Sequence, residues 1–228
     1  MKTLFKTVQV LFLSVLLGPV NAGTAEQAVA YIAYTEGYWQ AWVMAPDGTQ
    51  QRQVTQSPYD KHRLSWYPDG KSLLVNGNQG ELNRVNVSSG EETPVTLSLA
   101  GMNDAMVSPD GRRIAFSLSA AGTSDGNDIW VVNTDGSDLL KKTTMKWLQH
   151  EPAWSPDGKK LAWSCQDNNR PKVGFDRNTA ICYSEYDPVT GWSLKAKLTS
   201  DPTTGVSLYS AESAPTWNPT SDKLVYSK

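Results

Sequence analysis

One turn motif recurs at a fixed register along the chain, and it constrains the fold more than any other feature. Proline presets φ at the first turn position, aspartate bonds to nearby backbone, and glycine accepts the left-handed conformation. Each copy therefore predicts a tight turn between two strands. The copies span Trp66–Gly70, Val107–Gly111 and Trp154–Gly158, with a degenerate fourth at Trp217–Asp222.

A short apolar run follows each copy of the motif, and a related run occurs near the N-terminus. These runs are Ile32–Tyr34, Leu73–Val75, Ile114–Phe116, Leu161–Trp163 and Leu224–Tyr226. A second family of turns lies further along each unit, at Ala45–Gly48, Ser88–Gly90, Asn133–Gly136 and Asp187–Gly191. The pattern predicts four short strands per unit of about 40 residues, which is typical of a β-propeller blade. A β-sandwich also has short strands, but it does not require one turn at a recurring register.

At these motifs the chain resembles the TolB-like family of propeller repeats, in which a strand ending in Trp-Ser-Pro-Asp-Gly is followed by an apolar strand. The resemblance covers residues 31 to 228 and implies an all-β propeller of four-stranded blades. Family propellers use six blades, whereas this chain has about four blades plus an incomplete one, so we expect a truncated or incomplete propeller. Only about eight residues separate the predicted cleavage site from the first strand, so we also expect no counterpart of the α/β domain that precedes the propeller in the protein for which the family is named.

The resemblance carries two further expectations. In the family, a C-terminal strand completes the N-terminal blade, so Ala214–Trp217 is a candidate to complete the blade of Tyr31–Thr55, leaving Leu224–Tyr226 surplus. Partners would be peptidoglycan-associated or Tol-system proteins of the envelope. Unclosed blade edges would also favour oligomers or aggregation.

The first 22 residues predict a cleavable signal peptide. Lys2 and Lys6 precede the apolar run Val8–Leu17, and small residues precede a cut after Ala22. The run is only half of the roughly 20 residues that span a bilayer, and no later segment is apolar enough. We therefore expect residues 23–30 to form a short N-terminal segment before a periplasmic protein with no membrane span.

Two composition features bear on the partners and the compartment. Lysine and arginine number 21 against 23 aspartate and glutamate, so no basic surface is expected for nucleic acid. In an oxidising compartment, Cys165 and Cys182 are expected to form a disulfide, because they lie in adjacent predicted strands of one blade. The alternative is a pair of buried free thiols.

A candidate binding site arises from the register of the two histidines. His62 and His150 each lie six residues before the proline of their repeat, and Asn103 and Ser213 occupy the matching positions. These four side chains would line one mouth of the central channel, with Glu151 beside His150. Two histidines without a third ligand make an incomplete metal site, so no metal, cofactor or catalytic residue is predicted.

Two other patterns have structural interpretations. Gly122–Gly126 matches the string of a nucleophile elbow, but a strand follows it where that mechanism needs a helix. Trp66, Trp154 and Trp217 share one repeat position and are expected to pack blade against blade.

The leading functional hypothesis is a non-enzymatic protein-binding or scaffold protein of the envelope that uses the rim of the propeller. The alternative is a carbohydrate-binding or oligosaccharide-cleaving propeller that uses the channel histidines. A third class, the regulatory propeller of an exported peptidase, would require a hydrolase domain after the propeller.

Overall fold

The computed structural model describes residues 28–95, 99, 101–119, 127–143, 148–166, 179–187, 191–197 and 213–227. This part of the chain is built from antiparallel strands and contains no helix, so it holds no helix able to span a membrane. The predicted all-β class is confirmed. The predicted signal peptide and the Gly122–Gly126 string lie outside the described residues.

The strands form five antiparallel sheets, and within each sheet neighbours in sequence are neighbours in space. The first sheet contains β1 (Val29–Thr35), β2 (Tyr38–Met44) and β3 (Arg52–Gln53). The second contains β4 (Lys61–Trp66), β5 (Ser72–Gly77), β6 (Leu82–Asn86) and β7 (Glu92–Pro94). The third contains β8 (Met102–Val107), β9 (Arg113–Ser119), β10 (Asn127–Asn133) and β11 (Leu140–Lys141). The fourth contains β12 (Gln149–Trp154), β13 (Lys160–Gln166), β14 (Thr179–Asp187) and β15 (Gly191–Lys197), and the fifth contains β16 (Ser213–Trp217) and β17 (Leu224–Ser227).

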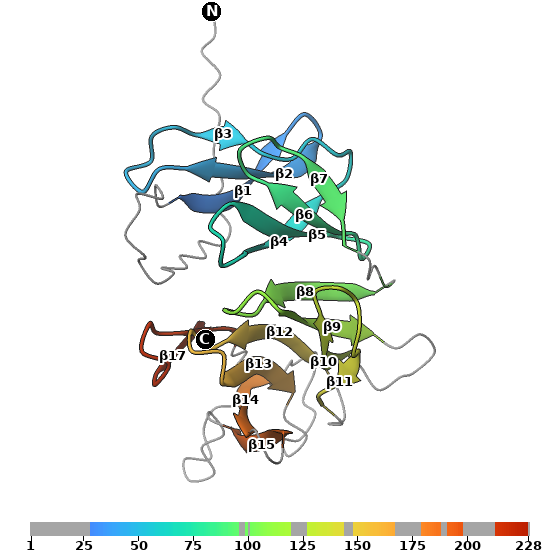
Figure 1. Cartoon of the computed structure of the whole chain (residues 1–228), viewed down its shortest axis with the longest axis vertical. Coiled ribbons are helices and arrows are strands. Elements are labelled where there is room, and N and C mark those ends of the chain that lie inside the picture. The colour runs from blue at the N-terminus through green and yellow to red at the C-terminus, as the bar shows by residue number, and fades with distance from the viewer. Residues whose placement is uncertain are drawn as a thin grey trace, which may run out of the picture.

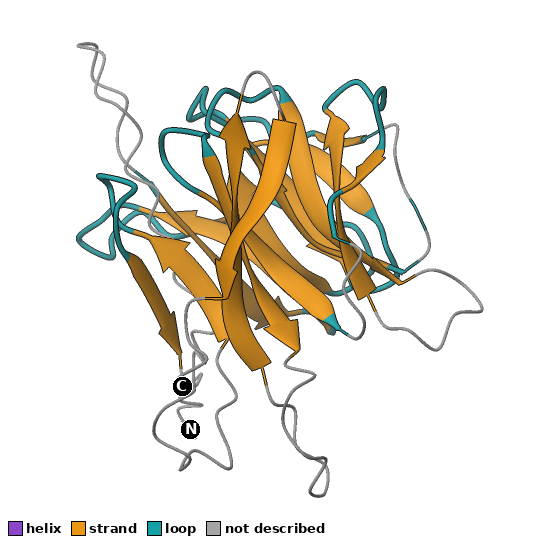
Figure 2. Cartoon of the chain, turned by 90° about the horizontal axis from the view of Figure 1, so that it is seen from below, coloured by secondary structure: helices purple, strands orange, loops and turns teal. Residues whose placement is uncertain are grey.

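The sheets follow one another in space in the order of the sequence (Figure 1). The first strand of each later sheet contacts the sheet before it: β4 contacts β1 and β2, β8 contacts β4 and β5, β12 contacts β8 to β10, and β16 contacts β12 to β14. Seen from below, the described parts of the molecule are strands joined by loops (Figure 2). These first strands are therefore the inner strands of a propeller-type arrangement, and we call them so below.

The inner strand of the fifth sheet does not have the closing role that the family resemblance suggested. β16 pairs with β17, with Trp217 opposite Leu224, instead of completing the first sheet, which consists of β1, β2 and β3. The turn at Asn218 explains the difference, because the Asn218 N–H donates to the carbonyl of Lys223 and brings β17 back along β16. A local hairpin closes a short loop, whereas pairing with β1 closes nearly the whole chain.

Hydrogen bonds account for the recurring turn motif. In the fourth sheet, the Ser155 hydroxyl donates to Asp157 and accepts the Lys160 N–H at 2.8 Å, while the Lys159 N–H donates to Asp157 at 3.0 Å. Gly158 has φ 70°, the left-handed conformation that the turn requires. The predicted tight turn between two strands is confirmed, and the serine and aspartate of the motif supply its acceptors.

The repeated tryptophans pack between sheets as predicted. Trp66 packs on an apolar cluster shared by the first and second sheets. The Trp154 indole N–H donates to the carbonyl of Met106 in the preceding sheet at 3.3 Å, and that of Trp217 donates to the carbonyl of Ala153 at 3.1 Å. Trp154 and Trp217 thus combine packing between sheets with a specific hydrogen bond to the neighbouring sheet.

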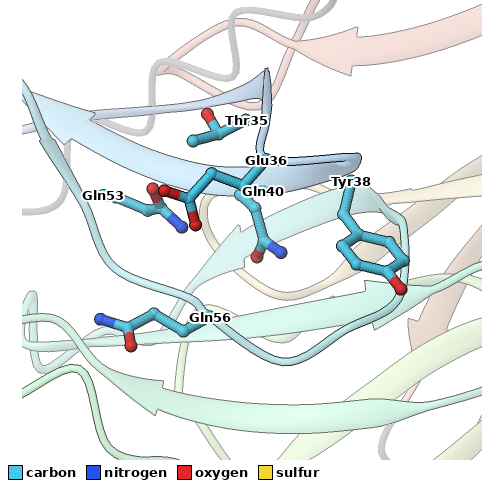
Figure 3. A pocket seen from close by; sticks show the side chains of 6 residues that line it. All are labelled: Thr35, Glu36, Tyr38, Gln40, Gln53 and Gln56. Atoms are coloured by element: carbon cyan, nitrogen blue, oxygen red, sulfur yellow. The ribbon is translucent and has the colours of Figure 1, made fainter.

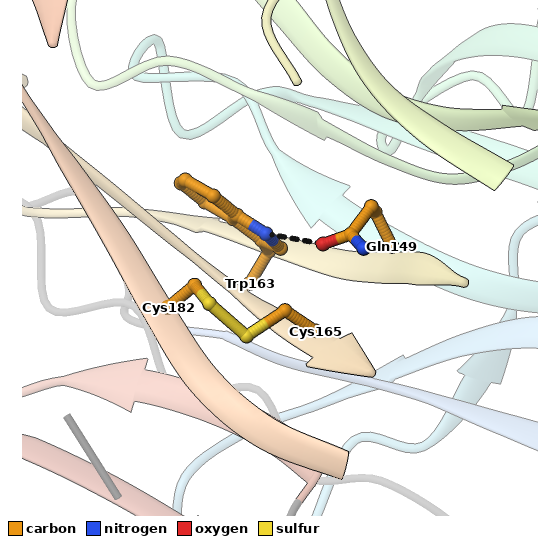
Figure 4. The surroundings of a disulfide bond; sticks show 4 residues. All are labelled: Gln149, Trp163, Cys165 and Cys182. Atoms are coloured by element: carbon orange, nitrogen blue, oxygen red, sulfur yellow. Dashed lines mark hydrogen bonds between the residues drawn. A yellow bond between two sulfur atoms is a disulfide. The ribbon is translucent and has the colours of Figure 1, made fainter. Parts of the chain in front are cut away.

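A disulfide joins the two cysteines, as predicted. Cys165 of β13 and Cys182 of β14 are both buried, with Cα atoms 5.9 Å apart. Trp163 lies beside the bond, and its indole N–H donates to the Gln149 side chain at 2.9 Å (Figure 4). The bond ties the two central strands of the fourth sheet together.

Candidate functional site

The four side chains predicted at the channel mouth do share one position in the fold. His62, Asn103, His150 and Ser213 lie at the starts of the inner strands β4, β8, β12 and β16. The pairing with the next strand shifts register at this position, directly after Asn103, His150 and Ser213 and across His62 itself, which marks a β-bulge. We call this set the inner-strand row. Bulges change the direction of side chains and of backbone groups, and they are common near binding sites.

A second row follows one residue later and lies five residues before the proline. Asp104, Glu151 and Ala214 have φ values of 56°, 54° and 52°, all in the left-handed region that side-chain-bearing residues seldom adopt. Sequence reasoning identified Glu151 but missed Asp104. The available signal was its register, because Asp104 precedes Pro109 by the same five residues that separate Glu151 from Pro156.

The two carboxylates of this second row connect successive sheets. Asp104 Oδ2 accepts the Glu151 N–H at 3.3 Å and the Ser117 hydroxyl at 3.2 Å. In the same way, Glu151 Oε2 accepts the Ala214 N–H at 2.6 Å and the Ser164 hydroxyl at 2.9 Å. Each acid thus takes a hydroxyl from its own sheet and a backbone N–H from the next sheet.

Asn76 makes the corresponding connection from the second sheet, at the register of Ser117 and Ser164. Its side-chain oxygen accepts the Ala105 N–H at 2.8 Å, and its amide donates to the Ala105 carbonyl at 3.1 Å. The second, third, fourth and fifth sheets are therefore held in sequence by buried or half-buried polar bonds. Such bonds fix the relative positions of the inner strands.

The histidines sit in different environments. His150 Nδ1 lies 3.6 Å from Glu151 Oε2, and both side chains are partly exposed. Burial lowers the pKa of His62, which the charge of Asp104 only partly opposes, and its Nδ1 has no hydrogen-bond partner in the described structure. His62 is therefore uncharged at neutral pH, because its pKa falls below the ordinary value of 6.5.

The other two predicted residues contribute less side-chain chemistry. Asn103 donates from its side-chain amide to the Gly101 carbonyl at 3.1 Å. Ser213 takes part in the β16–β17 pairing, and its side chain is outside the described part. The structure thus brings Asp104, His150 and Glu151 together. Among the described residues, no group of three or more His, Cys, Asp or Glu side chains is placed to share a metal ion.

A buried lysine beside His62 was not foreseen. Lys61 is 1% exposed, and its ammonium donates to the carbonyls of Ser57 and Tyr59 and lies 3.9 Å from the centre of the Tyr59 ring. Burial lowers the pKa of Lys61, against the charges of Glu92, Asp60 and Glu81. A lysine at the start of a predicted strand is normally exposed to solvent, so nothing in the residue pattern indicated this role.

Glu92 fixes the same connection between β3 and β4 from the other side. Its carboxylate accepts the N–H groups of Gln56 and Ser57 at 2.8 and 3.1 Å, and the Ser57 hydroxyl at 2.6 Å. The loop that leads into the inner strand β4 is therefore held by charge-assisted bonds at both ends.

A cavity of about 400 Å³ lies next to this loop, at one end of the first sheet (Figure 3). It was not predicted, because its lining combines the β1–β2 hairpin with β3 and the loop before β4. The lining residues are polar or aromatic: Thr35, Glu36, Tyr38, Gln40, Gln53 and Gln56. We call it the first-sheet pocket.

Comparison with known sequences finds relatives that match part of this chain. No protein-family profile matches the chain. It is 29% identical over 129 residues to the Tol-Pal system protein TolB of Anaeromyxobacter dehalogenans, covering 55% of this chain and 29% of that protein. It is 26% identical over 141 residues to the uncharacterized peptidase YuxL of Bacillus subtilis, covering 60% of this chain and 20% of that protein. The chain thus spans less than a third of the length of either relative.

Solved structures agree on the architecture. TolB from Acinetobacter baumannii superposes with a TM-score of 0.66 at 21% identity, over 87% of this chain and 46% of that one. The putative TolB from Agrobacterium tumefaciens gives a TM-score of 0.58 at 25% identity, over 74% of this chain and 60% of that one. The predicted TolB-like type of propeller repeat is confirmed.

Proposed function

We propose that this chain, a member of the TolB-like β-propeller family, is a non-enzymatic protein-binding or scaffold module of the cell envelope. The binding surface would be the inner-strand row and the loops around it. Its partner would be an envelope protein, and the relatives named Tol-Pal system protein TolB favour a component of that system.

The observation that carries the proposal is that the carboxylates of Asp104 and Glu151 hold neighbouring sheets together. Asp104 and Glu151 are occupied by N–H and hydroxyl donors from two sheets each, so they hold the inner strands in position. A general acid or base needs a carboxylate that can reach a substrate. A rigid surface of polar side chains on fixed strands suits recognition, because little conformational entropy is lost on binding.

Two observations support a periplasmic location. Residues 1–22 have the charged, apolar and small-residue regions of a signal peptide. The disulfide between Cys165 and Cys182 is of the kind that persists in oxidising compartments.

Binding to the soluble domain of the host's peptidoglycan-associated protein tests the proposal. Isothermal titration calorimetry would compare the wild-type mature chain with the double variant His62→Ala/His150→Ala. We expect saturable binding by the wild type and at least tenfold weaker binding by the double variant. The matched control is Arg112→Ala/Lys159→Ala, which changes two exposed residues in the Pro-Asp-Gly turns at the other ends of the inner strands. Absence of wild-type binding, or equal losses in both variants, would contradict the proposal.

The carbohydrate alternative rests on one contact, the 3.6 Å approach of His150 Nδ1 to Glu151 Oε2. It predicts stoichiometric binding of a divalent metal ion and cleavage of an acidic oligosaccharide. Both would be lost in His62→Ala/His150→Ala. That result would replace the binding function with an enzymatic one.

A further inference from the structure

We propose that the first-sheet pocket binds a neutral saccharide unit. The pocket lies between the β1–β2 turn, strands β2 and β3, and the loop before β4, so it is separate from the inner-strand row. In Figure 3, Glu36, Gln40 and Gln53 lie close to one another, with Tyr38 and Gln56 at the sides. The proposal is independent of the protein-binding function.

The pocket lies on the face of the first sheet that is turned away from the second sheet. Trp39 and Ala41 pack into the cluster shared with the second sheet. Side chains alternate between the two faces of a strand, so Gln40 and Tyr38 belong to the opposite face. A ligand there would not compete with the packing of the two sheets.

Buried hydrogen bonds hold the floor of the pocket in one conformation. Gln40 is 3% exposed; its Oε1 accepts the Thr55 hydroxyl at 2.7 Å, and its Nε2 donates to the Ser57 carbonyl at 3.0 Å. Gln53 donates from Nε2 to the Thr55 carbonyl at 2.7 Å. An amide group has two N–H donors and an acceptor oxygen, so each glutamine retains hydrogen-bonding capacity after these contacts. This arrangement is preorganised for a polar ligand.

The third sheet contains the same local framework with different side chains. The Ala41 N–H donates to the Thr55 hydroxyl at 2.8 Å, and the Ile129 N–H donates to the Thr143 hydroxyl at 2.9 Å. The residue before Ile129 is Asp128, which stands where Gln40 stands in the first sheet.

The strand that follows matches in the same way. The backbone N–H of Lys142 donates to the carbonyl of Ile129, just as the backbone N–H of Val54 donates to the carbonyl of Ala41. Lys141 therefore occupies the position of Gln53. Lys141 and Asp128 form an ion pair at 2.5 Å. The third sheet therefore satisfies its own polar groups at this register, whereas the first sheet has two neutral amides facing a cavity.

The lining indicates which ligand would fit. Sugar hydroxyls both donate and accept, as do the glutamine amides and the Thr35 hydroxyl. Tyr38 is 37% exposed and offers a ring for the apolar face of a sugar. The single charge, on Glu36, and the absence of a cation among the described lining residues disfavour an anionic ligand. The volume of about 400 Å³ falls within the usual range for small-molecule sites.

A peptide is the less favoured occupant. Peptides are generally recognised by strand addition or by apolar pockets for alternate side chains. No aliphatic side chain lines the described part of this pocket. Peptide binding is therefore an outcome that the experiment must separate from saccharide binding.

The internal repeat supplies the decisive variant. Gln40→Asp combined with Gln53→Lys would install the ion pair of the third sheet in the first sheet. Because Asp128 and Lys141 already fit this framework, the double variant should fold, which a thermal melt would check. Lys141→Met is the matched control, since it changes the same register in the third sheet and leaves the pocket intact.

The test measures binding by saturation-transfer NMR and calorimetry. It uses three ligands: two neutral trimers, tri-N-acetylglucosamine and maltotriose, and the anionic trimer trigalacturonate. We expect at least one neutral trimer to bind the wild type, the Lys141→Met variant and the His62→Ala/His150→Ala variant alike. We expect at least tenfold weaker binding by Gln40→Asp/Gln53→Lys, and weaker binding of trigalacturonate by the wild type.

Three results would overturn the inference. The first is that neither neutral trimer binds at about 10 mM, a weak-affinity limit. The second is unchanged binding by Gln40→Asp/Gln53→Lys, and the third is tighter binding of a neutral tetrapeptide at the same residues. Loss of saccharide binding in His62→Ala/His150→Ala would place the ligand in the inner-strand row instead. Failure of the protein-binding proposal would leave all of these measurements unaffected.

Discussion

Replacement of Glu151 by alanine removes the carboxylate that joins the fourth and fifth sheets. The Ala214 N–H, 2.6 Å away, and the Ser164 hydroxyl, 2.9 Å away, would both lose their acceptor. A hydrogen bond to a charged group contributes about 1.5–3 kcal/mol. Glu151 is partly exposed, so water replaces some of this loss. We expect the free energy of unfolding to fall by about 3 kcal/mol, which corresponds to a fall in Tm of about 6–12 °C for a domain of this size.

Urea unfolding followed by tryptophan fluorescence would measure this change, because Trp154 and Trp217 lie at the affected interface. Glu151→Gln keeps an acceptor oxygen without the charge and should fall between the wild type and Glu151→Ala. The exposed Glu91 provides a control, since Glu91→Ala should change the free energy of unfolding by less than about 0.5 kcal/mol. A loss of less than about 1 kcal/mol of unfolding free energy in Glu151→Ala, or unchanged hydrogen exchange at the Ala214 amide, would show that Glu151 does not join the two sheets.

Further expectations concern acid stability, the disulfide and association. Burial lowers the pKa of His62 from 6.5. As the pH falls below 6.5, the unfolded state therefore binds a proton more readily than the folded state, and stability should fall. His62→Gln should flatten that part of a pH series of urea midpoints. In Cys165→Ala/Cys182→Ala, loss of the crosslink over a sequence separation of 17 should cost roughly 3 kcal/mol, and alkylation of periplasmic protein should find no free thiol. Val225 on β17 is 67% exposed, so light scattering should detect concentration-dependent association that Val225→Lys reduces; a monomer at all concentrations would contradict this expectation.

The repeat motif made the strands and their order predictable. Each Pro-Asp-Gly turn forces a hairpin whatever surrounds it, because its bonds to Asp69, Asp110 and Asp157 are local. The same register placed His62 and His150 at equivalent strand starts, and it identified the tryptophans between sheets. Adjacent strands made the cysteine pairing predictable.

Features that depend on contacts between segments were not predictable. The register of Asp104 marked its position, but its bond to the Glu151 N–H depends on the third and fourth sheets meeting, which the nearby sequence does not show. Lys61 is buried because the carbonyls of Ser57 and Tyr59 fold over it. The first-sheet pocket combines Glu36, Gln40 and Gln53 from different strands and turns. The fourth turn motif predicted the hairpin of β16 and β17, whereas the closing role that the family resemblance suggested for Ala214–Trp217 is not seen.

The most direct test of the central claim is hydrogen exchange of the mature chain with and without the soluble domain of the peptidoglycan-associated protein. Protein recognition through the inner-strand row predicts slower exchange in peptides that contain His62, Asn103 and His150. It predicts unchanged exchange in the turns around Pro68, Pro109 and Pro156 at the opposite ends of those strands. Protection confined to these turns, or no protection with a saturating partner, would contradict the account.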